Sequence, residues 1–99
     1  MSTSRDYLDY VLDLLSVTGG ITYKKMMGEY LLYRDGVLFG GVYDNRFLVK
    51  KLPSLDSYHF KEHIPYPGAK PMLLVDMEDP FEVKAIVENV VTSLTEIKR

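Results

Sequence analysis

Residues 28–51 read GEYLLYRDGVLFGGVYDNRFLVKK and contain two strong turn signals. Asp35-Gly36 and Asp44-Asn45 are pairs that tolerate positive φ, and each pair lies between runs rich in Tyr, Leu, Val and Phe. Such pairs favour two-residue hairpin turns, because the twist of these turns matches that of the flanking strands. The stretch therefore predicts three antiparallel strands in a β-meander.

Two-residue turns would also set the register of these strands. Directly opposed residues of a ladder lie on the same face of the sheet. The turns predict these pairs: Tyr33 with Leu38, Leu31 with Gly40, Val42 with Phe47, and Gly40 with Val49. One predicted face carries Leu31, Tyr33, Leu38, Val42, Phe47 and Val49. The second predicted face carries Tyr30, Leu32, Phe39, Gly41, Tyr43, Arg46, Leu48 and Lys50.

Both predicted faces are rich in large apolar side chains. An antiparallel sheet with one solvated face normally alternates apolar and polar residues. Two explanations stay open: other elements cover both faces, or the second face contacts another protein chain. Under the second explanation, the candidate protein interface consists of Tyr30, Leu32, Phe39, Tyr43 and Leu48.

The composition is typical of one folded domain. Ninety-nine residues are enough for one core and too few for two. The absence of cysteine excludes a structural disulfide and a thiolate zinc site, and it fits a reducing cytoplasm. Acidic residues interrupt the apolar stretches at the N-terminus, and no run approaches the roughly 18 apolar residues of a spanning helix. We expect a soluble cytoplasmic protein, with a single domain over residues 1–99 and no membrane contact.

The net charge of −2 argues against binding nucleic acid through the overall field of the protein. Charge is nevertheless uneven, because residues 24–51 hold six basic residues against three acidic ones. This candidate basic surface consists of Lys24, Lys25, Arg34, Arg46, Lys50 and Lys51. Basic residues on a sheet edge more often prevent edge-to-edge aggregation than bind DNA. Direct contact with nucleic acid therefore stays as the alternative interpretation.

Signals on either side of the meander predict the remaining elements. Thr3 or Ser4 caps a helix that reaches about Val17. A further strand follows over residues 21–27, and Gly28 allows a bend or bulge before the meander. Pro53 begins a short helix or two helical turns within residues 52–63.

The C-terminal third adds one strand and one helix. Residues 72–75, MLLV, form a compact apolar run typical of a covered strand. Asp79-Pro80 combines a capping residue with proline at the first helical position. Together the elements predict an α+β fold. Its antiparallel meander sheet has about five strands, flanked by an N-terminal helix, a short middle helix and a C-terminal helix.

The sequence carries no specific catalytic motif. The sequence contains no GxSxG, GxxxxGK[ST] or GxGxxG motif. His59 and His63 are four residues apart and could share a helical face as metal ligands, but no third ligand is indicated. Two surface histidines explain the same pattern. We therefore predict no catalytic residue, no cofactor and no metal, and we expect a protein that is not an enzyme.

Residues 24–50, KKMMGEYLLYRDGVLFGGVYDNRFLVK, resemble the N-terminal domain of TfoX-like (Sxy-like) competence regulators. The residues that match the family pattern in order and spacing are Lys24, Lys25, Met26, Gly28, Tyr33, Asp35, Gly36, Phe39 and Lys50. The resemblance continues through Tyr66-Pro67 and the final strand and helix. It departs at Met27, where the family has Phe, and at Phe47-Leu48, where the family has Leu-Tyr.

This resemblance implies a single TfoX N-terminal-like domain, related to regulators of natural DNA uptake that act with a transcription activator. The family usually carries a second, C-terminal domain, which residues 1–99 do not include. We expect a regulatory or adaptor domain that acts by protein-protein contact, with another protein or with itself as a homodimer. The alternatives are direct binding of nucleic acid through the basic residues and binding of a small ligand.

Overall fold

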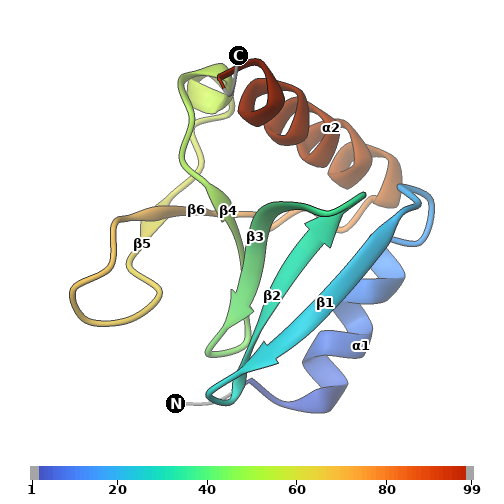
Figure 1. The fold of residues 1–99 in the computed structure, drawn as a ribbon, viewed down its shortest axis with the longest axis vertical. Coiled ribbons are helices and arrows are strands. Elements are labelled where there is room, and N and C mark those ends of the chain that lie inside the picture. The colour runs from blue at the N-terminus through green and yellow to red at the C-terminus, as the bar shows by residue number, and fades with distance from the viewer. Residues whose placement is uncertain (1–2, 98–99) are drawn as a thin grey trace.

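The structure is a computed structural model that describes residues 3–97. In chain order its elements are α1 (Arg5–Leu14), β1 (Ile21–Met26), β2 (Glu29–Arg34), β3 (Val37–Tyr43), β4 (Arg46–Lys50), the 3-10 helix η1 (Pro53–Tyr58), β5 (Glu62–His63), β6 (Met72–Leu74) and α2 (Pro80–Ile97). The strands form one antiparallel sheet in the order β1-β2-β3-β4-β6-β5, with α1 lying behind β1 in Figure 1. The predicted α+β fold is confirmed.

The two predicted hairpin turns are confirmed. Asp35 and Gly36 have φ values of 50° and 82°, and Asp44 and Asn45 have values of 50° and 56°. Positive φ at both central residues is the conformation whose twist suits a two-residue hairpin. The turns therefore join β2 to β3 and β3 to β4 as the sequence indicates.

A third turn of the same kind joins β1 to β2. Met27 has φ 52° and Gly28 has φ 84°, where the sequence predicts only a bend or bulge at Gly28. Methionine at positive φ is uncommon, because its Cβ crowds the backbone there. The pair Met-Gly is consequently a weak turn signal, which explains the difference.

Capping residues define both α-helices. The Ser4 side chain accepts a hydrogen bond from the Tyr7 backbone N–H at 3.1 Å, so Ser4 is the cap of α1. That helix ends at Leu14, earlier than the predicted end near Val17. Asp79 accepts a hydrogen bond from the Phe81 N–H at 2.9 Å, which confirms the predicted start of α2. Within residues 3–97, no helix is long and apolar enough to span a bilayer.

The region predicted as a short middle helix is only partly helical. A 3-10 helix covers Pro53–Tyr58, His59 then adopts φ 56°, and the chain continues into β5. His59 and His63 therefore lie in different elements and do not share a helical face. Among the described residues, no group of three or more His, Cys, Asp or Glu side chains could hold a metal ion.

A β-bulge in β3 distinguishes the observed register from the predicted one. The pairs between β2 and β3 are Tyr30–Val42, Leu31–Gly41, Leu32–Gly40, Tyr33–Leu38 and Arg34–Val37. Phe39 has no partner in this ladder and is the extra residue of the bulge. The predicted pair of Leu31 with Gly40 is wrong by one position. The predicted pairs of β3 with β4 are confirmed.

The bulge reverses the predicted faces for part of the sheet, because a slip of one residue moves side chains to the opposite face. The face toward the helices carries Tyr30, Leu32, Phe39, Val42, Phe47 and Val49. The opposite face, here called the open face, carries Lys24, Leu31, Tyr33, Leu38, Gly41, Tyr43, Arg46, Leu48, Lys50, Met72 and Leu74.

One hydrophobic core fills the space between the sheet and the two α-helices. From α1 and the residue that follows it, the core includes Leu8, Val11, Leu14 and Leu15, and from α2 it includes Val83, Ile86, Val87 and Val90. From the sheet it includes the six apolar side chains on the face toward the helices. Leu38, which the predicted register places on the same face as Val42, Phe47 and Val49, is instead partly exposed on the open face.

The five residues predicted as a protein interface do not share one face. Tyr30, Leu32 and Phe39 are exposed by only 6%, 0% and 0%, and they pack in the core. Tyr43 and Leu48 lie on the open face, where they are also buried. The predicted common face for these side chains is therefore wrong, because the bulge at Phe39 was absent from the predicted register.

Candidate functional site on the open face of the sheet

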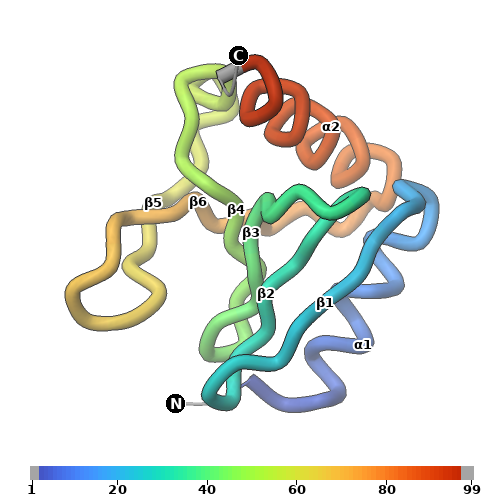
Figure 2. The backbone as a smooth tube through the Cα atoms, viewed as in Figure 1, coloured from blue at the N-terminus to red at the C-terminus, as the bar shows by residue number. Residues whose placement is uncertain are grey.

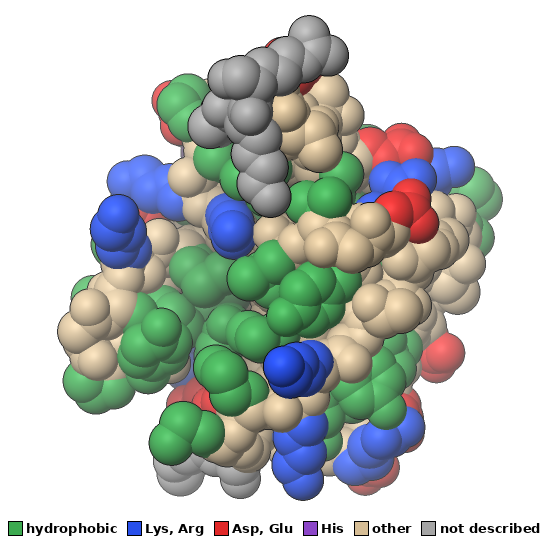
Figure 3. Space-filling view, in the orientation of Figure 1, with side chains coloured by type: hydrophobic (Ala, Val, Ile, Leu, Met, Phe, Trp, Pro, Cys, Tyr) green, Lys and Arg blue, Asp and Glu red, His purple; other side chains and the backbone are tan. Residues whose placement is uncertain are grey.

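The open face presents apolar side chains away from the core that contains both α-helices. Leu31, Tyr33, Leu38, Met72 and Leu74 are each partly exposed there. In Figure 3 apolar side chains gather near the centre of this face, with basic side chains around them. A solvated sheet face would carry mainly polar residues, and a contiguous apolar patch is typical of a contact surface.

The loop between β5 and β6 stands out from the sheet beside β4 (Figure 2). Residues of this loop and of the open face line a groove. The Tyr66 ring in this loop contacts the Tyr43 ring of β3, with ring centroids 6.3 Å apart. The groove has a volume of about 500 Å³, which lies within the range of small-molecule sites. Its lining includes Leu38, Tyr43, Lys50, Tyr66, Lys70 and Met72.

Gly41 allows the Tyr43 ring to approach the backbone of β3 closely. A Cβ atom added to Gly41 would come within 2.7 Å of Tyr43 Cε2. The close approach of this packed side chain to the backbone explains why glycine occupies position 41. Burial raises the pKa of Tyr43, with Tyr66 as a further cause, so its hydroxyl stays neutral at physiological pH and can donate a hydrogen bond.

The groove has a basic lining. Lys50, Lys51 and Lys70 all line it, and none of the described lining residues is Asp or Glu. Lys51 Nζ forms an ion pair with Glu62 Oε2 at 2.7 Å, and this hydrogen bond raises the pKa of Lys51. Within residues 3–97, no ion pair engages Lys50 or Lys70. The charge available to an incoming ligand therefore lies mainly on these two lysines.

The six residues of the predicted basic surface are dispersed over the molecule. Lys24 and Lys25 are exposed on β1 at the edge of the sheet, and their side chains alternate between the two faces. Lys50 and Lys51 lie beyond two further strands, at the groove. The structure thus gathers only part of the predicted set.

Both arginines of the predicted basic surface form ion pairs with carboxylates. Arg34 lies toward α2, where its Nη2 is 3.8 Å from Glu88 Oε2. Arg46 Nη1 is 2.9 Å from Asp44 Oδ2. Ion pairs of this kind reduce the positive field that a phosphate backbone would meet.

Lys70 belongs to the groove but not to the predicted set. It lies in a loop whose sequence, YPGAKP over residues 66–71, carries turn signals but no periodic pattern. Placing this lysine near Lys50 requires β6 to pair with β4. That pairing is long-range, and no local signal in the sequence specifies it.

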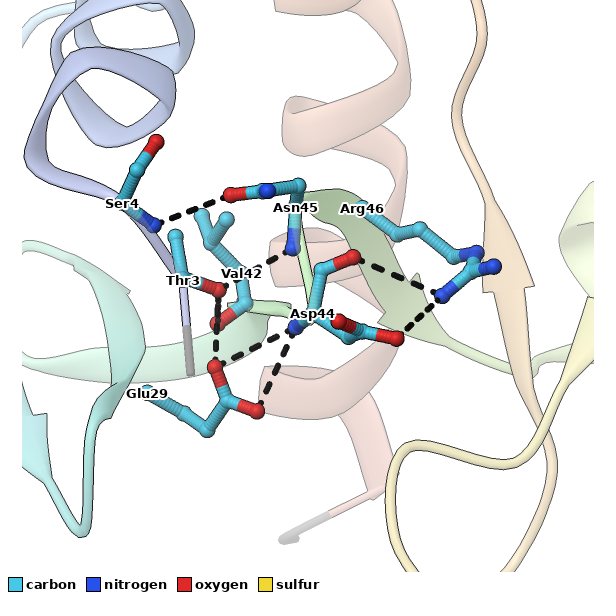
Figure 4. Close-up of polar contacts among 7 residues, drawn as sticks. All are labelled: Thr3, Ser4, Glu29, Val42, Asp44, Asn45 and Arg46. Atoms are coloured by element: carbon cyan, nitrogen blue, oxygen red, sulfur yellow. Dashed lines mark hydrogen bonds and ion pairs between the residues drawn. The ribbon is translucent and has the colours of Figure 1, made fainter. Parts of the chain in front are cut away.

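The most connected polar cluster in the structure has a structural role. The Glu29 carboxylate accepts hydrogen bonds from Thr3 Oγ1 at 2.7 Å and from the Asp44 N–H at 3.2 Å (Figure 4). The Asn45 N–H donates to Thr3 Oγ1 at 3.2 Å, and the Ser4 N–H donates to Asn45 Oδ1 at 2.9 Å. These bonds hold the start of α1 against the turn between β3 and β4. The Glu29 carboxylate therefore stabilises the turn between β3 and β4.

Replacing Glu29 by alanine should lower the free energy of unfolding by about 2 kcal/mol, because the Thr3 hydroxyl and the Asp44 N–H each lose a charged acceptor. Urea denaturation followed by circular dichroism measures this change. Glu78 is exposed and serves as the control, since its replacement by alanine should change stability by less than about 0.5 kcal/mol. Equal losses in the two variants would contradict the role given to Glu29.

Comparison with known proteins identifies a bacterial relative of the chain. No protein-family model matches the chain. The chain is 33% identical over 78 residues to a protein of Spirochaeta aurantia described as an uncharacterized 12.7 kDa protein in the trpE 5′ region. The match covers 77% of this chain and 68% of that protein.

Proposed function

The chain belongs to the family of the 12.7 kDa protein of Spirochaeta aurantia, and we propose that it is a non-enzymatic module that binds a partner protein through its open face. One observation carries this proposal. The helices and the face of the sheet toward them share a closed core, while apolar side chains on the other face remain partly exposed. Burying such a patch against a partner is favourable by roughly 25 cal/mol per Å² before the cost of association.

Charge around the patch favours a partner that carries carboxylates. Lys24, Lys50 and Lys70 lie on or beside the open face, and Lys24 is exposed. A symmetric dimer through this face would bring the same basic patch of each protomer together. Like charges placed opposite one another are unfavourable. The proposed partner is therefore a different protein, with an apolar stripe flanked by Asp or Glu.

A regulatory role fits this proposal. The resemblance of residues 24–50 to TfoX-like regulators implies a cytoplasmic domain that acts with a transcription activator in competence. The open face supplies a surface on which such an activator, or another regulator, could dock. The role in competence rests on the resemblance alone.

Direct binding of nucleic acid is the second candidate, and the distribution of charge favours it less. Arg34, Arg46 and Lys51 are each paired with a carboxylate, and the net charge of the chain is −2. A phosphate-binding surface would need a dense array of free cations. The remaining lysines lie apart on the sheet, so they suit the margin of a protein interface better.

Replacing Leu38 by aspartate should abolish capture of the partner while the domain stays folded. Leu38 is partly exposed on the open face, so a carboxylate there can remain hydrated in the free protein but would be desolvated in the complex. Immobilised wild-type and variant proteins are incubated with cytoplasmic extract of the native organism, and retained proteins are compared by quantitative mass spectrometry. We expect at least about a tenfold loss of the partner.

Val17→Asp is the matched control, because Val17 is 38% exposed in the turn after α1 and does not belong to the sheet. It should retain the same partner as the wild type. Thermal unfolding of both variants verifies that they fold. Undiminished capture by Leu38→Asp would refute the proposed surface. Loss of capture after nuclease treatment, together with steep weakening in salt, would instead indicate nucleic acid.

A further inference from the structure

We propose that the groove between the open face and the β5–β6 loop binds a small organic anion with a flat apolar body, whose charged group lies between Lys50 and Lys70. The groove shares Leu38, Lys50 and Lys70 with the surface proposed above for protein contact, but its ligand is a small molecule. It rests on the shape of the groove, the chemistry of its walls and the distribution of charge around it.

The walls of the groove suit a flat apolar body. Leu38 and Met72 provide aliphatic surface from the sheet, while Tyr43 and Tyr66 provide aromatic surface. The two tyrosine rings are inclined at 50° to each other, so they form a corner in which a further ring can make contact. A volume of about 500 Å³ accommodates a ligand of one or two fused rings with a substituent.

The lysines select the charge of the ligand. Lys50 lies on the open face, is partly buried and lines the groove. Lys70 approaches from the loop. The two ammonium groups would repel a cationic ligand. A neutral ligand would remove water from these ammonium groups without offering a charge in return, which is unfavourable. An anion compensates both charges, and low-dielectric walls strengthen the attraction.

The loop is built to keep the groove open. Proline occurs at residues 65, 67 and 71, and each proline fixes φ of its residue. Gly68 adopts φ 87°, and the Ala69 N–H donates to the Tyr66 carbonyl oxygen at 3.1 Å, which closes a turn at the tip of the loop. A restricted loop loses little entropy when a ligand enters. The groove is thus preformed.

Tyr43 adds a hydrogen-bond donor at the groove. A tyrosine hydroxyl is protonated at physiological pH, and burial raises the pKa of Tyr43 further, so this hydroxyl can donate to an acceptor on the ligand. A carboxylate and a phosphate monoester both fit the two lysines and this donor. The shared chemistry is an oxyanion on an aromatic or similarly flat body, and the experiment below distinguishes the two groups.

Three naphthalene probes test the inference on the full chain by ¹H–¹⁵N chemical-shift titration. 2-Naphthoate and 2-naphthyl phosphate carry the two anionic groups, and 2-naphthamide is the neutral counterpart. We expect saturable shifts of the amides of Gly40, Tyr66, Lys70 and Met72. At least one anion should bind about tenfold more tightly than the amide, and the tighter of the two identifies the preferred group.

Two charge-reversed variants with the same change in net charge complete the test. Lys50→Glu with Lys70→Glu should weaken binding of the anion at least about tenfold, whereas Lys24→Glu with Lys25→Glu should change it less than about twofold. The pair Lys50→Gln with Lys70→Gln gives the same readout if the glutamates impair folding. Equal binding of anion and amide, shifts without saturation, or equal weakening in the two glutamate variants would each overturn the proposal.

The outcome is separable from that of the protein-binding proposal. Titration with the small probes does not depend on a partner protein, and capture of the partner is measured with Leu38→Asp. Loss of probe binding in the Lys50 and Lys70 variants would support the anion site whether or not capture of the partner also weakens, because both lysines border the protein-contact surface as well. Failure of the probes with capture intact would refute the anion site alone.

Discussion

Replacing Phe39 by alanine should lower the free energy of unfolding by about 3–5 kcal/mol, because its ring is 0% exposed within the core. A domain of this size is stable by about 5–15 kcal/mol, so the loss would be severe. Leu38, the next residue toward the N-terminus, is partly exposed on the open face. Its replacement by alanine should cost only about 1 kcal/mol. Guanidinium denaturation of both variants measures the difference.

This pair of variants tests the bulge in β3. Without the bulge, Leu38 would face the helices and Phe39 would face away from them, so the two losses would exchange their sizes. A small loss for Phe39→Ala with a large loss for Leu38→Ala would therefore contradict the observed register. In both variants, the slope of the unfolding free energy against denaturant concentration should equal that of the wild type. Both losses then refer to the same folded and unfolded states.

Replacing Gly40 by alanine should lower the free energy of unfolding by about 3 kcal/mol, at the upper end of the range for overpacking. A Cβ atom at this position would overlap the Leu48 carbonyl oxygen and lie 2.9 Å from Val49 Cα. These are backbone atoms of the neighbouring strand, which cannot move aside as a flexible side chain can. β3 and β4 would have to separate, and their pairing would weaken. Thermal and urea unfolding measure the loss.

Gly68→Ala is the control for this substitution. Gly68 has no atom within 4 Å of an added Cβ, so alanine there bears only the cost of its positive φ. That cost is about 1–2 kcal/mol. The difference between the two variants isolates the steric overlap at Gly40. If Gly40→Ala were no less stable than Gly68→Ala, the close approach of β3 to β4 would be wrong.

The sequence predicts most of the fold because the relevant signals are local. Asp35-Gly36 and Asp44-Asn45 specify their turns through the conformational freedom of those residue types. Ser4 and Asp79 mark helix starts through side-chain oxygens that accept from nearby N–H groups. Each of these features depends on residues within a few positions of one another. The turn at Met27-Gly28 is less visible, because Met is unusual at positive φ.

The bulge could not be predicted from the pattern, because β3 is apolar on both sides of Phe39. Alternation of polar and apolar residues normally reveals a change of face. In the run VLFGGVY no polar residue marks that change. The energy of burying the Phe39 ring among the helices decides the register instead. The paired glycines that follow are consistent with irregular strand geometry.

The groove could not be predicted from the sequence for a different reason. Lys50 and Lys70 are 20 positions apart in the sequence, and only the pairing of β4 with β6 brings their segments together. The short strand β5, of two residues, completes that edge of the sheet and fixes the start of the loop. Neither pairing leaves a periodic signal. A loop rich in Pro and Gly gives the position of a turn without indicating which strand it faces.

Both the proposed protein-contact surface and the proposed anion groove depend on which side chains lie on each face of the sheet. Relaxation of leucine and valine methyl signals by a neutral, soluble gadolinium chelate measures this assignment directly, at a concentration where sedimentation shows single protomers. Methyl groups of Leu31 and Leu38 should relax strongly, because both side chains are partly exposed on the open face. Those of Leu32 and Val49, which are 0% exposed, should be protected. Strong relaxation of Leu32 together with protection of Leu31 would contradict the account.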